Sequence, residues 1–393
     1  MRVSPSQTPK NGGESPHDNS PLAGEYHEMN PSLKSTPMKY ESQKVQELSS
    51  GDIARWADLQ IADPRYASPF LRPEFTQWMS EVREDIRVVV IREGDIPVGF
   101  FPFGRCGAAA HPVGTPLSDS QGVVAAPSCR WDGSELLKAT GLRRLVFDHW
   151  IPGQEEIGPF CSVGIPCANV DLSEGFEAYV ENKKKQGSNL FHDVRRKQKK
   201  LARDHGKIRC ELLHDPQSVE RLMEWQSAQC TRTRVADLLR FNWPRQVLHA
   251  TVARATQACG TLLWGLYANE RLIATNMICR SHEFAHGWFM AFDPNYACYS
   301  PGTILIHEIL RELPMQGVTR LDMGKGVSGY KKRLMTGSTT TYEGIIDPQP
   351  ATRAVWAHWQ RTRDWLRRSR FRPVAHRANR VISNVRWFLG SNY

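Results

Sequence analysis

Residues 261–292 read TLLWGLYANERLIATNMICRSHEFAHGWFMAF. This stretch holds three apolar, β-rich runs, at residues 261–268, 272–279 and 284–292, separated by the polar turns Asn269-Glu270 and Ser281-His282-Glu283. Polar connections this short favour hairpins, so the stretch predicts three consecutive antiparallel strands. The fold class follows from the elements around this meander.

Helical and strand patterns alternate on both sides of the meander. A strand at 208–212 and two helices, near 216–226 and 244–255, precede it, and the elements that follow are a helix from Pro301, a strand at 318–323, a helix at 330–334 and a strand at 340–346. The resulting order, βααβββαβαβ, predicts an α/β protein with a mixed sheet and helices on its faces.

Composition divides the chain into segments of different character. Residues 46–182 also contain strand and helix patterns but are less regular, with a loop-rich part at 104–135. The predicted organisation is a disordered Ser/Pro-rich tail (1–45), a first half (46–182), a basic linker helix (183–207), a second half (208–348) and an Arg/Trp-rich helical segment (349–393).

The net charge of +10 is concentrated in two places. Residues 183–209 hold eleven Lys and Arg against two Asp, and residues 351–393 hold ten Arg against one Asp, so the rest of the chain is acidic. Each basic segment therefore needs its own explanation.

Several protein classes are disfavoured by composition. Nine scattered Cys without a CxxC pair argue against a disulfide scaffold or zinc ribbon, and the His spacing suggests no metal ligands. The sequence shows neither a secretory apolar segment nor a membrane-spanning run, and it contains no Walker loop or Gly-x-Ser-x-Gly elbow. These features predict a cytoplasmic protein without a metal.

Three motifs carry a resemblance to a known family. They are the run Phe191-His192-Asp193 to Asp204-His205-Gly206, the run Tyr299-Ser300-Pro301-Gly302-Thr303, and the run Leu321-Asp322-Met323-Gly324-Lys325-Gly326 followed by Tyr330-Lys331. In this order they resemble the CelD-like group, linked to cellulose biosynthesis, of the GNAT acetyltransferases. Pro69-Phe70-Leu71 and Pro116-Leu117-Ser118-Asp119 also fit that group, and the resemblance spans about residues 50–348.

The resemblance implies two GNAT-like halves in tandem, the second better formed, and an acyl-CoA co-substrate such as acetyl-CoA. In GNAT proteins the pyrophosphate lies at a helix start, which places the cradle at Ser300, Pro301, Gly302 and Thr303. The helix N-terminus offers free N–H groups and partial positive charge. One glycine stands here where the family has two small residues, so an ordinary Pro/Gly helix start is the alternative.

The resemblance also assigns catalytic and substrate-binding residues. Tyr330 occupies the place of the tyrosine that often protonates the departing thiolate, although a tyrosine that anchors the helix fits equally. Asp322 is either a general base or a cap for the loop after it, and His286 is taken as a surface or packed strand histidine. Lys331 and Lys332 could hold a phosphate or a carbohydrate carboxylate. The implied reaction is direct acyl transfer to a small-molecule or carbohydrate acceptor, in a polysaccharide context.

Two other functions stay open. The basic segment at 183–209 could contact RNA, as in Fem-type aminoacyl-tRNA-dependent transferases with a twin-GNAT plan, but a solvated helix face is the plainer interpretation and nucleic acid is not the expected partner. Alternatively, the chain is a GNAT scaffold that has lost its chemistry. The C-terminal Arg/Trp segment can dock on the domain or lie on anionic lipid at the inner face of the membrane.

Overall fold

The predicted meander forms strands β9 (Gly260–Ala268), β10 (Arg271–Ser281) and β11 (Phe284–Phe292) in a computed structural model that describes residues 37–327 and 329–368. Asn269 and His282, in the two turns, have positive φ angles of 52° and 50°. Both are polar residues that tolerate the left-handed conformation, which lets short turns connect the strands.

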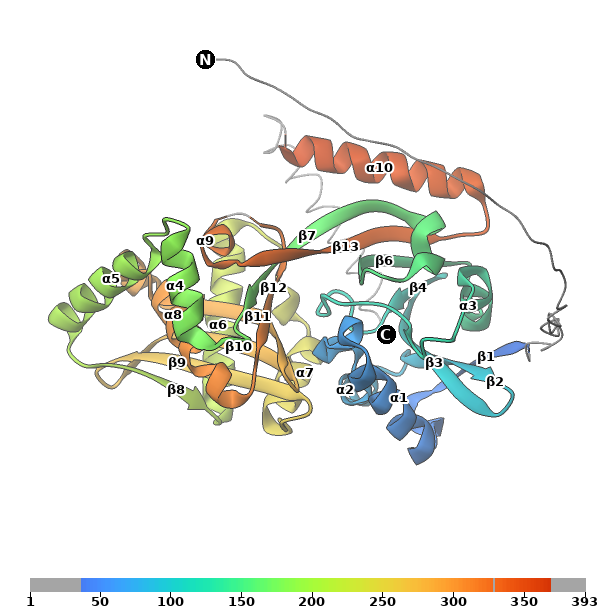
Figure 1. The fold of residues 1–393 in the computed structure, drawn as a ribbon, viewed down its shortest axis with the longest axis horizontal. Helices are drawn as coiled ribbons and strands as arrows, with labels where there is room; N and C mark the ends of the chain where they lie inside the picture. The colour runs from blue at the N-terminus through green and yellow to red at the C-terminus, as the bar shows by residue number, and fades with distance from the viewer. Residues whose placement is uncertain (1–36, 328, 369–393) are drawn as a thin grey trace, which may run out of the picture. The chain divides into compact units, whose positions relative to one another are not determined.

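The remaining elements complete an α/β fold (Figure 1). The other strands are β1 (Met38–Lys44), β2 (Arg87–Glu93), β3 (Ile96–Cys106), β4 (Ala109–Pro112), β5 (Val124–Ala125), β6 (Arg144–Trp150), β7 (Cys161–Asp171), β8 (Ile208–Leu213), β12 (Arg320–Lys325) and β13 (Gly337–Ile346). The α-helices are α1 (Ser50–Ala62), α2 (Pro73–Val82), α3 (Gly133–Thr140), α4 (Gly175–Lys185), α5 (Leu190–His205), α6 (Pro216–Thr233), α7 (Asn242–Ala253), α8 (Pro301–Glu312), α9 (Tyr330–Leu334) and α10 (Pro350–Arg368).

The second half has the element order that its sequence pattern predicts, from β8 to β13. All of the strands except β5 lie side by side in the order β1-β2-β3-β4-β6-β13-β7-β12-β11-β10-β9-β8, and β5 pairs with β3. Most pairs are antiparallel, while β4 with β6 and β11 with β12 are parallel. The predicted mixed sheet is therefore confirmed.

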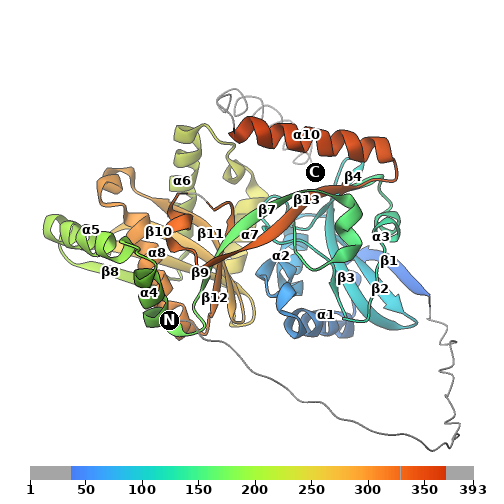
Figure 2. The same cartoon turned by 45° about the horizontal axis from the view of Figure 1, so that its top comes forward.

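The two halves exchange strands where they meet. β7, from the first half, lies between β12 and β13 of the second half and pairs with both. β13 in turn pairs with β6 of the first half, so each half completes the sheet of the other (Figure 2). The described residues form one compact unit.

Separate cores cover the two faces of the second half. On one face, α5 and α8 bury apolar side chains such as Val194, Leu201 and Ile309 against β9, β10 and β12. On the other face, α6 and α7 bury Leu222 and Leu248 against β9 and β10. The first half has its own aromatic core around Trp56, Phe100 and Trp150.

Three segment predictions are corrected. Residues 38–44, placed in the tail, form edge strand β1, where backbone pairing with β2 compensates for the polar sequence. The basic linker is two helices, because Gly187, at φ +74°, ends the helical path between α4 and α5. Helix α3, capped by Asp132, begins inside the stretch predicted as loops.

The chain ends are described in part. Tail residues 1–36 and the C-terminal residues 369–393, with Phe371, Pro373 and Trp387, lie outside the described residues. Helix α10 lies along β7 and β13 (Figure 1), with Arg363 paired to the buried carboxylate of Glu343. Within residues 37–327 and 329–368, no helix combines the length and apolar character needed to cross a bilayer.

Candidate active site

The parallel strands β11 and β12 stay paired for three residues and then part. Phe284 to His286 face Arg320 to Asp322, and no pairing continues beyond them in the register of these strands. Gly324, at φ +73°, bends β12 at this point, and a Cβ there would lie 3.0 Å from an Asp119 carboxylate oxygen. Glycine therefore permits both the bend and the close approach of the first half.

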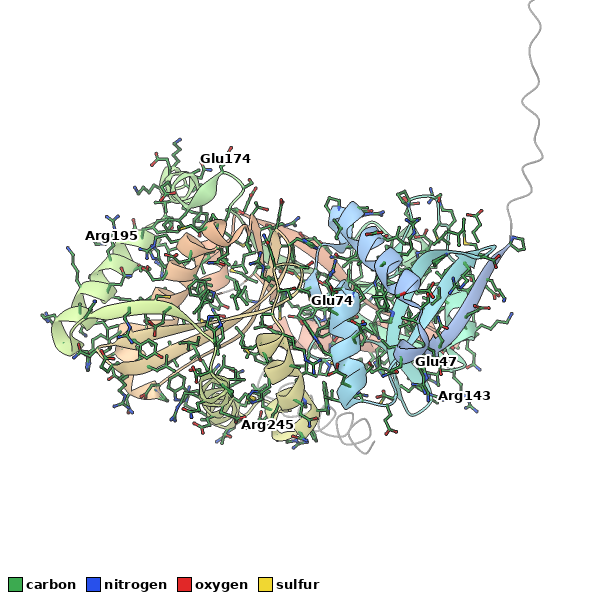
Figure 3. All side chains as sticks on the ribbon, turned by 90° about the horizontal axis from the view of Figure 1, so that it is seen from below. Glu47, Glu74, Arg143, Glu174, Arg195 and Arg245 are labelled. Atoms are coloured by element: carbon green, nitrogen blue, oxygen red, sulfur yellow. The ribbon has the colours of Figure 1, made fainter. Side chains whose placement is uncertain are left out.

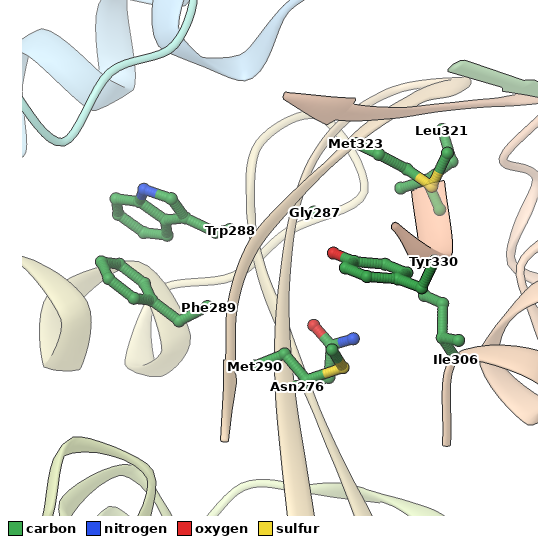
Figure 4. A pocket seen from close by; sticks show the side chains of 9 residues that line it. All are labelled: Asn276, Gly287, Trp288, Phe289, Met290, Ile306, Leu321, Met323 and Tyr330. Carbon is green, nitrogen blue, oxygen red and sulfur yellow. The ribbon is translucent and has the colours of Figure 1, made fainter. Parts of the chain in front are cut away.

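A small pocket, with a cavity volume of about 60 Å³, opens where the strands part. Its lining comes from β10, β11, β12, α8 and α9, and the residues are Asn276, Gly287, Trp288, Phe289, Met290, Ile306, Leu321, Met323 and Tyr330 (Figure 4). The lining side chains are mostly of apolar type, but polar atoms contribute about half of the pocket surface, and the Tyr330 hydroxyl is directed across the pocket towards β11 (Figure 4). The pocket is therefore a narrow space of mixed polarity beside the Tyr330 hydroxyl.

Tyr330 is the first residue of α9, directly after Gly329, whose φ is +60°. Its side chain is partly open to the pocket, and burial raises its pKa above the usual value. The phenol therefore holds its proton at neutral pH and can donate it. Tyr330 therefore brings a protonated hydroxyl to the pocket between β11 and β12.

The predicted cradle lies at the start of α8. Ser300 adopts φ 53° and ψ 56°, and its carbonyl oxygen already accepts from the N–H groups of Thr303 and Ile304. Because Pro301 has no N–H, this described turn leaves the N–H of Gly302 for a ligand. Gly302 packs on the pocket residue Met290, whose sulfur would lie 3.1 Å from an added Cβ. The start of α8 thus offers fewer free N–H groups than a glycine-rich loop would, but it lies next to the pocket.

The basic helix α5 reaches this same turn. Lys197 Nζ donates a hydrogen bond to Ser300 Oγ at 2.8 Å, and Lys200 Nζ lies 5.1 Å from the centre of the Tyr299 ring. Lys199 and Arg195, on the same helix, are exposed to solvent (Arg195 is labelled in Figure 3). Lys197 is half-buried at this contact, whereas Lys200 is exposed, so α5 presents a solvated face in which, among the described side chains, Lys197 alone is hydrogen-bonded to the start of α8.

We expect Lys197→Gln to weaken acetyl-CoA binding by about 5- to 20-fold, because one charged contact to a phosphate is worth about 1–2 kcal/mol. Lys199→Gln is the matched control, since Lys199 is exposed on the same helix. Calorimetry on both variants measures the difference. Equal affinities in the two variants would show that Lys197 serves only to hold Ser300.

A run of alternating carboxylates and imidazoles crosses from the first half to the pocket; we call it the carboxylate–imidazole chain. Asp148 Oδ1 lies 3.1 Å from His149 Nδ1, and His149 Nε2 lies 3.4 Å from Asp119 Oδ1. Asp119 Oδ2 lies 3.2 Å from His286 Nε2, and His286 Nδ1 lies 3.4 Å from Asp322 Oδ2. Asp322 also accepts a hydrogen bond from the Gly324 N–H at 2.8 Å, so it caps the loop and meets an imidazole at once.

Contacts between the halves position the chain. Trp288, on β11, donates its indole N–H to the Leu117 carbonyl at 2.8 Å, two residues before Asp119. The Gln121 side-chain amide donates to Asp148 at 2.8 Å, and its oxygen accepts from the backbone N–H of Asp148 and His149. The loop that carries Asp119 is therefore tied to both β6 and β11.

Charge pairing dominates the electrostatics of the chain. Burial alone would lower the pKa of His286, but Asp119 and Asp322 on either side raise it to about 9. Burial opposes the charged form of His149 too, and Asp148 and Asp119 overcome it and raise its pKa. His286 is fully buried, so at neutral pH it is a cation whose two ring nitrogens each lie near a carboxylate and whose ring packs against Phe70.

This pairing predicts pH-dependent stability. Because the folded-state pKa of His286 lies above the usual 6.5, its stabilisation is complete below about pH 6.5 and is lost as the pH rises to about 9. We expect the free energy of unfolding to fall by about 3 kcal/mol over this range, at 1.36 kcal/mol per pKa unit. Urea denaturation at several pH values measures it, and His286→Gln should flatten the curve. A wild-type curve that is flat from pH 6.5 to 9 would contradict the assignment.

The structure brings only some of the site residues predicted from the sequence close to the pocket. Tyr330 lines the pocket, Asp322 stands between the lining residues Leu321 and Met323 in the sequence of β12, and Gly302 of the cradle packs on the lining residue Met290. Lys331 donates to the Lys325 carbonyl at 2.9 Å; burial lowers its pKa, and the nearby Asp119 and Asp322 oppose this. Lys332 is exposed. In the described part of the chain, no group of three or more His, Cys, Asp or Glu side chains could hold a metal ion.

Sequence reasoning missed most of the carboxylate–imidazole chain. It dismissed His286 as a lone strand histidine, gave Asp119 no role within the Pro116–Asp119 motif, and did not consider Asp148 or His149. Their partners lie on different strands, so no spacing along the sequence could have signalled them. The adjacent pair Asp148-His149 at the end of a predicted strand was the one local hint.

Comparisons with known proteins bear on the family and the fold. The Acetyltransferase (GNAT) domain family matches residues 188–332, while no curated protein matches the chain. The fold is similar to that of FemX, at a TM-score of 0.52 and 8% identity over 78% of this chain and 96% of that one.

A second similar structure is the C-terminal domain (DUF2156) of a putative lysylphosphatidylglycerol synthetase from Agrobacterium fabrum, at a TM-score of 0.50 and 12% identity over 78% of this chain and 94% of that one. A tandem GNAT protein from the clavulanic acid biosynthesis pathway has a TM-score of 0.46 and 14% identity over 80% and 99% of the two chains. Residues 188–332 thus match a GNAT acetyltransferase domain, and the predicted mixed α/β fold class is confirmed.

Proposed function

We propose that this protein transfers an acyl group from acyl-CoA directly to the amine or hydroxyl of an acceptor. The observation that carries the proposal is the pocket between the parting strands β11 and β12, which has Tyr330 on one side and adjoins the start of α8 through Met290. A thioester lying between the strands would have its phosphates near Gly302 and Lys197 and its reactive carbon near Tyr330. The residues present therefore fit acyl-CoA.

The proposed roles follow from protonation states. Asp322, an acceptor-side carboxylate next to the lining residues Leu321 and Met323, takes the proton of the acceptor as its nitrogen or oxygen attacks the carbonyl carbon. Tyr330, protonated at neutral pH, donates to the sulfur as the C–S bond breaks. Lys331 interacts electrostatically with Asp119 and Asp322. It would therefore also interact with a charged acceptor bound beside these carboxylates.

The acceptor class rests on the CelD-like motifs. A sugar or polysaccharide precursor is the proposed acceptor, and Lys331 and Lys332 would contact its phosphate or carboxylate. The test of the reaction class is calorimetry with acetyl-CoA. Micromolar binding is expected, and no binding of acetyl-CoA or of longer acyl-CoA would overturn the proposal in favour of a scaffold without chemistry.

Fem-type transfer from aminoacyl-tRNA is the second candidate. The observation in its favour is the row of exposed cations on α5, including Arg195 and Lys199, beside the cradle that Lys197 contacts. RNA binding would show a steep salt dependence that replacement of these cations flattens. Tight, salt-sensitive binding of aminoacyl-tRNA together with no acyl-CoA binding would favour this candidate.

For the C-terminal segment we propose docking on the sheet with lipid contact on the outer side. The Arg363–Glu343 pair and the Arg353 guanidinium over the Phe160 ring support docking. Val355 and Trp365 are exposed on α10, 70% and 61% respectively, and suit the headgroup layer at the inner face of the membrane. Sedimentation with anionic vesicles tests the contact, and failure to co-sediment would remove it.

A further inference from the structure

Asn276 places a carboxamide in the middle of the buried strand β10. Its neighbours Ala274 and Ile278 belong to the core that α5 and α8 cover, while Met277 belongs to the core under α6 and α7. Because side chains alternate along a strand, Asn276 faces α8 together with Ala274 and Ile278. A buried carboxamide costs free energy unless it is hydrogen-bonded, so this residue calls for an explanation.

The Asn276 side chain is 4% exposed, yet its amide makes no hydrogen bond within the described part of the chain. Its cross-strand neighbours, Trp264 on β9 and Met290 on β11, do not supply one. The indole N–H of Trp264 is itself buried without a partner among the described residues, and Met290 ends in a thioether. The amide is instead directed into the pocket, towards the same space as the Tyr330 hydroxyl (Figure 4).

The pocket is too small for the amide and the hydroxyl to serve separate ligand groups. A buried water needs roughly 10–15 Å³ of such volume, so a cavity of about 60 Å³ holds about four to six groups of that size. This is the size of an acetyl thioester, and a long acyl chain does not fit. With the sulfur at Tyr330, as in the proposed reaction, the carbonyl oxygen is the atom of the thioester left for Asn276, whose Nδ2 carries two protons to donate.

We propose that Asn276 donates a hydrogen bond from Nδ2 to the carbonyl oxygen of a short acyl thioester and so polarises the carbonyl group for attack. The inference rests on the proposed acyl transfer, and it adds a group of about the size of acetyl as the one transferred. The oxygen gains negative charge when the acceptor nitrogen or oxygen bonds to the carbonyl carbon, and it returns to a carbonyl when the C–S bond breaks. Asn276 gives up no proton in either step, and its hydrogen bond is strongest between them.

The unpartnered amide distinguishes this role from a structural one. Replacing a hydrogen-bonded buried amide by an apolar group leaves its partners unsatisfied, whereas Asn276 has no partner to leave among the described residues. We therefore expect Asn276→Leu, which has a similar shape, to keep or raise the free energy of unfolding measured with urea. A structural amide would instead lower it.

The test compares Asn276→Leu with Thr275→Val. Thr275 is the adjacent residue of β10; its hydroxyl is also buried without a partner among the described residues, but it does not line the pocket. Calorimetry gives the dissociation constants of acetyl-CoA and of CoA, which differ in the acetyl group alone. We expect Asn276→Leu to reduce the preference for acetyl-CoA over CoA by about 5-fold, the usual worth of one neutral hydrogen bond, and Thr275→Val to leave it unchanged.

Infrared spectra of bound acetyl-CoA, labelled with ¹³C at the carbonyl, report on the hydrogen bond directly. The carbonyl stretch is expected at a lower wavenumber in wild type and Thr275→Val than in Asn276→Leu. Equal wavenumbers, together with an unchanged preference for acetyl-CoA, would overturn the role of Asn276 and leave acyl transfer standing. Octanoyl-CoA is the third ligand, and tighter binding of it than of acetyl-CoA would overturn the size limit.

A further measurement needs only the wild-type protein. With ¹⁵N-labelled asparagine side chains, the NH₂ signal of Asn276 is expected to shift with acetyl-CoA and to stay in place with CoA. A signal that responds equally to both ligands would overturn the proposal even if Asn276→Leu failed to fold. A wild-type protein that binds neither acetyl-CoA nor CoA would overturn acyl transfer and this inference together.

Discussion

Tyr330→Phe is expected to lower kcat by roughly 10²–10⁴-fold and to leave acetyl-CoA affinity nearly unchanged, the usual range for loss of a general acid. The substitution keeps the ring that lines the pocket and removes only the hydroxyl directed towards β11 (Figure 4). A thiol with a pKa near 8.5 is a moderate leaving group, so protonation matters most as the C–S bond breaks. The effect should therefore fall on kcat.

The measurement is thiol release under conditions where chemistry limits the rate. Tyr267→Phe, on β9 and outside the pocket, is the control for loss of a tyrosine hydroxyl. Wild-type turnover in Tyr330→Phe would leave the tyrosine only a structural role. In that case Ser338, Thr339 or Thr340 on β13 would be the next hydroxyls to replace.

Gly302→Val is expected to weaken acetyl-CoA binding by about 100-fold or more, close to 3 kcal/mol, while the protein stays folded. An added side chain at residue 302 meets the sulfur and methyl groups of Met290, at 3.1 and 3.4 Å from the Cβ. The Met290 side chain is flexible and can move, but the free space next to it is the pocket that it lines. The substitution therefore fills the site and also covers the N–H that we assign to a phosphate.

Gly302→Ala is the graded control, since one methyl group asks Met290 to move by only a few tenths of an ångström. Calorimetry gives the affinities, and circular dichroism with thermal unfolding confirms the fold. Equal acetyl-CoA affinity in folded Gly302→Val and wild type would remove the start of α8 from the binding site.

The second half was predictable because its patterns are local. Runs such as 261–268 and 284–292 contain most of the information for their own strands, and Pro301-Gly302 marks a helix start by itself. The first half was less predictable, since β1 is a polar strand stabilised by backbone pairing to β2, and α3 follows a loop-rich stretch. Propensity carries little signal when pairing partners supply the stability.

The candidate site also has a part that the sequence could predict and a part that it could not. Tyr330, Asp322 and the cradle follow one another along the second half, so motifs could point to them. His286 and Asp119 are related only through packing of β11 against the loop that Trp288 holds at Leu117. The role of Lys197 likewise depends on which face of α5 meets α8. Contacts between segments that lie far apart in the sequence leave no pattern in the spacing of residues along the chain.

The strand exchange between the halves bears on biosynthesis. β7 is synthesised long before its neighbours β12 and β13, so it has no partner until nearly the whole described chain exists. Contacts between segments so far apart in sequence form slowly, because a long loop must close first. A nascent chain that stops before β12 would expose both edges of β7, and the site, which needs Asp322 from β12 beside Asp119 from the first half, cannot assemble until synthesis is almost complete. The topology thereby makes formation of the candidate site one of the last events of synthesis.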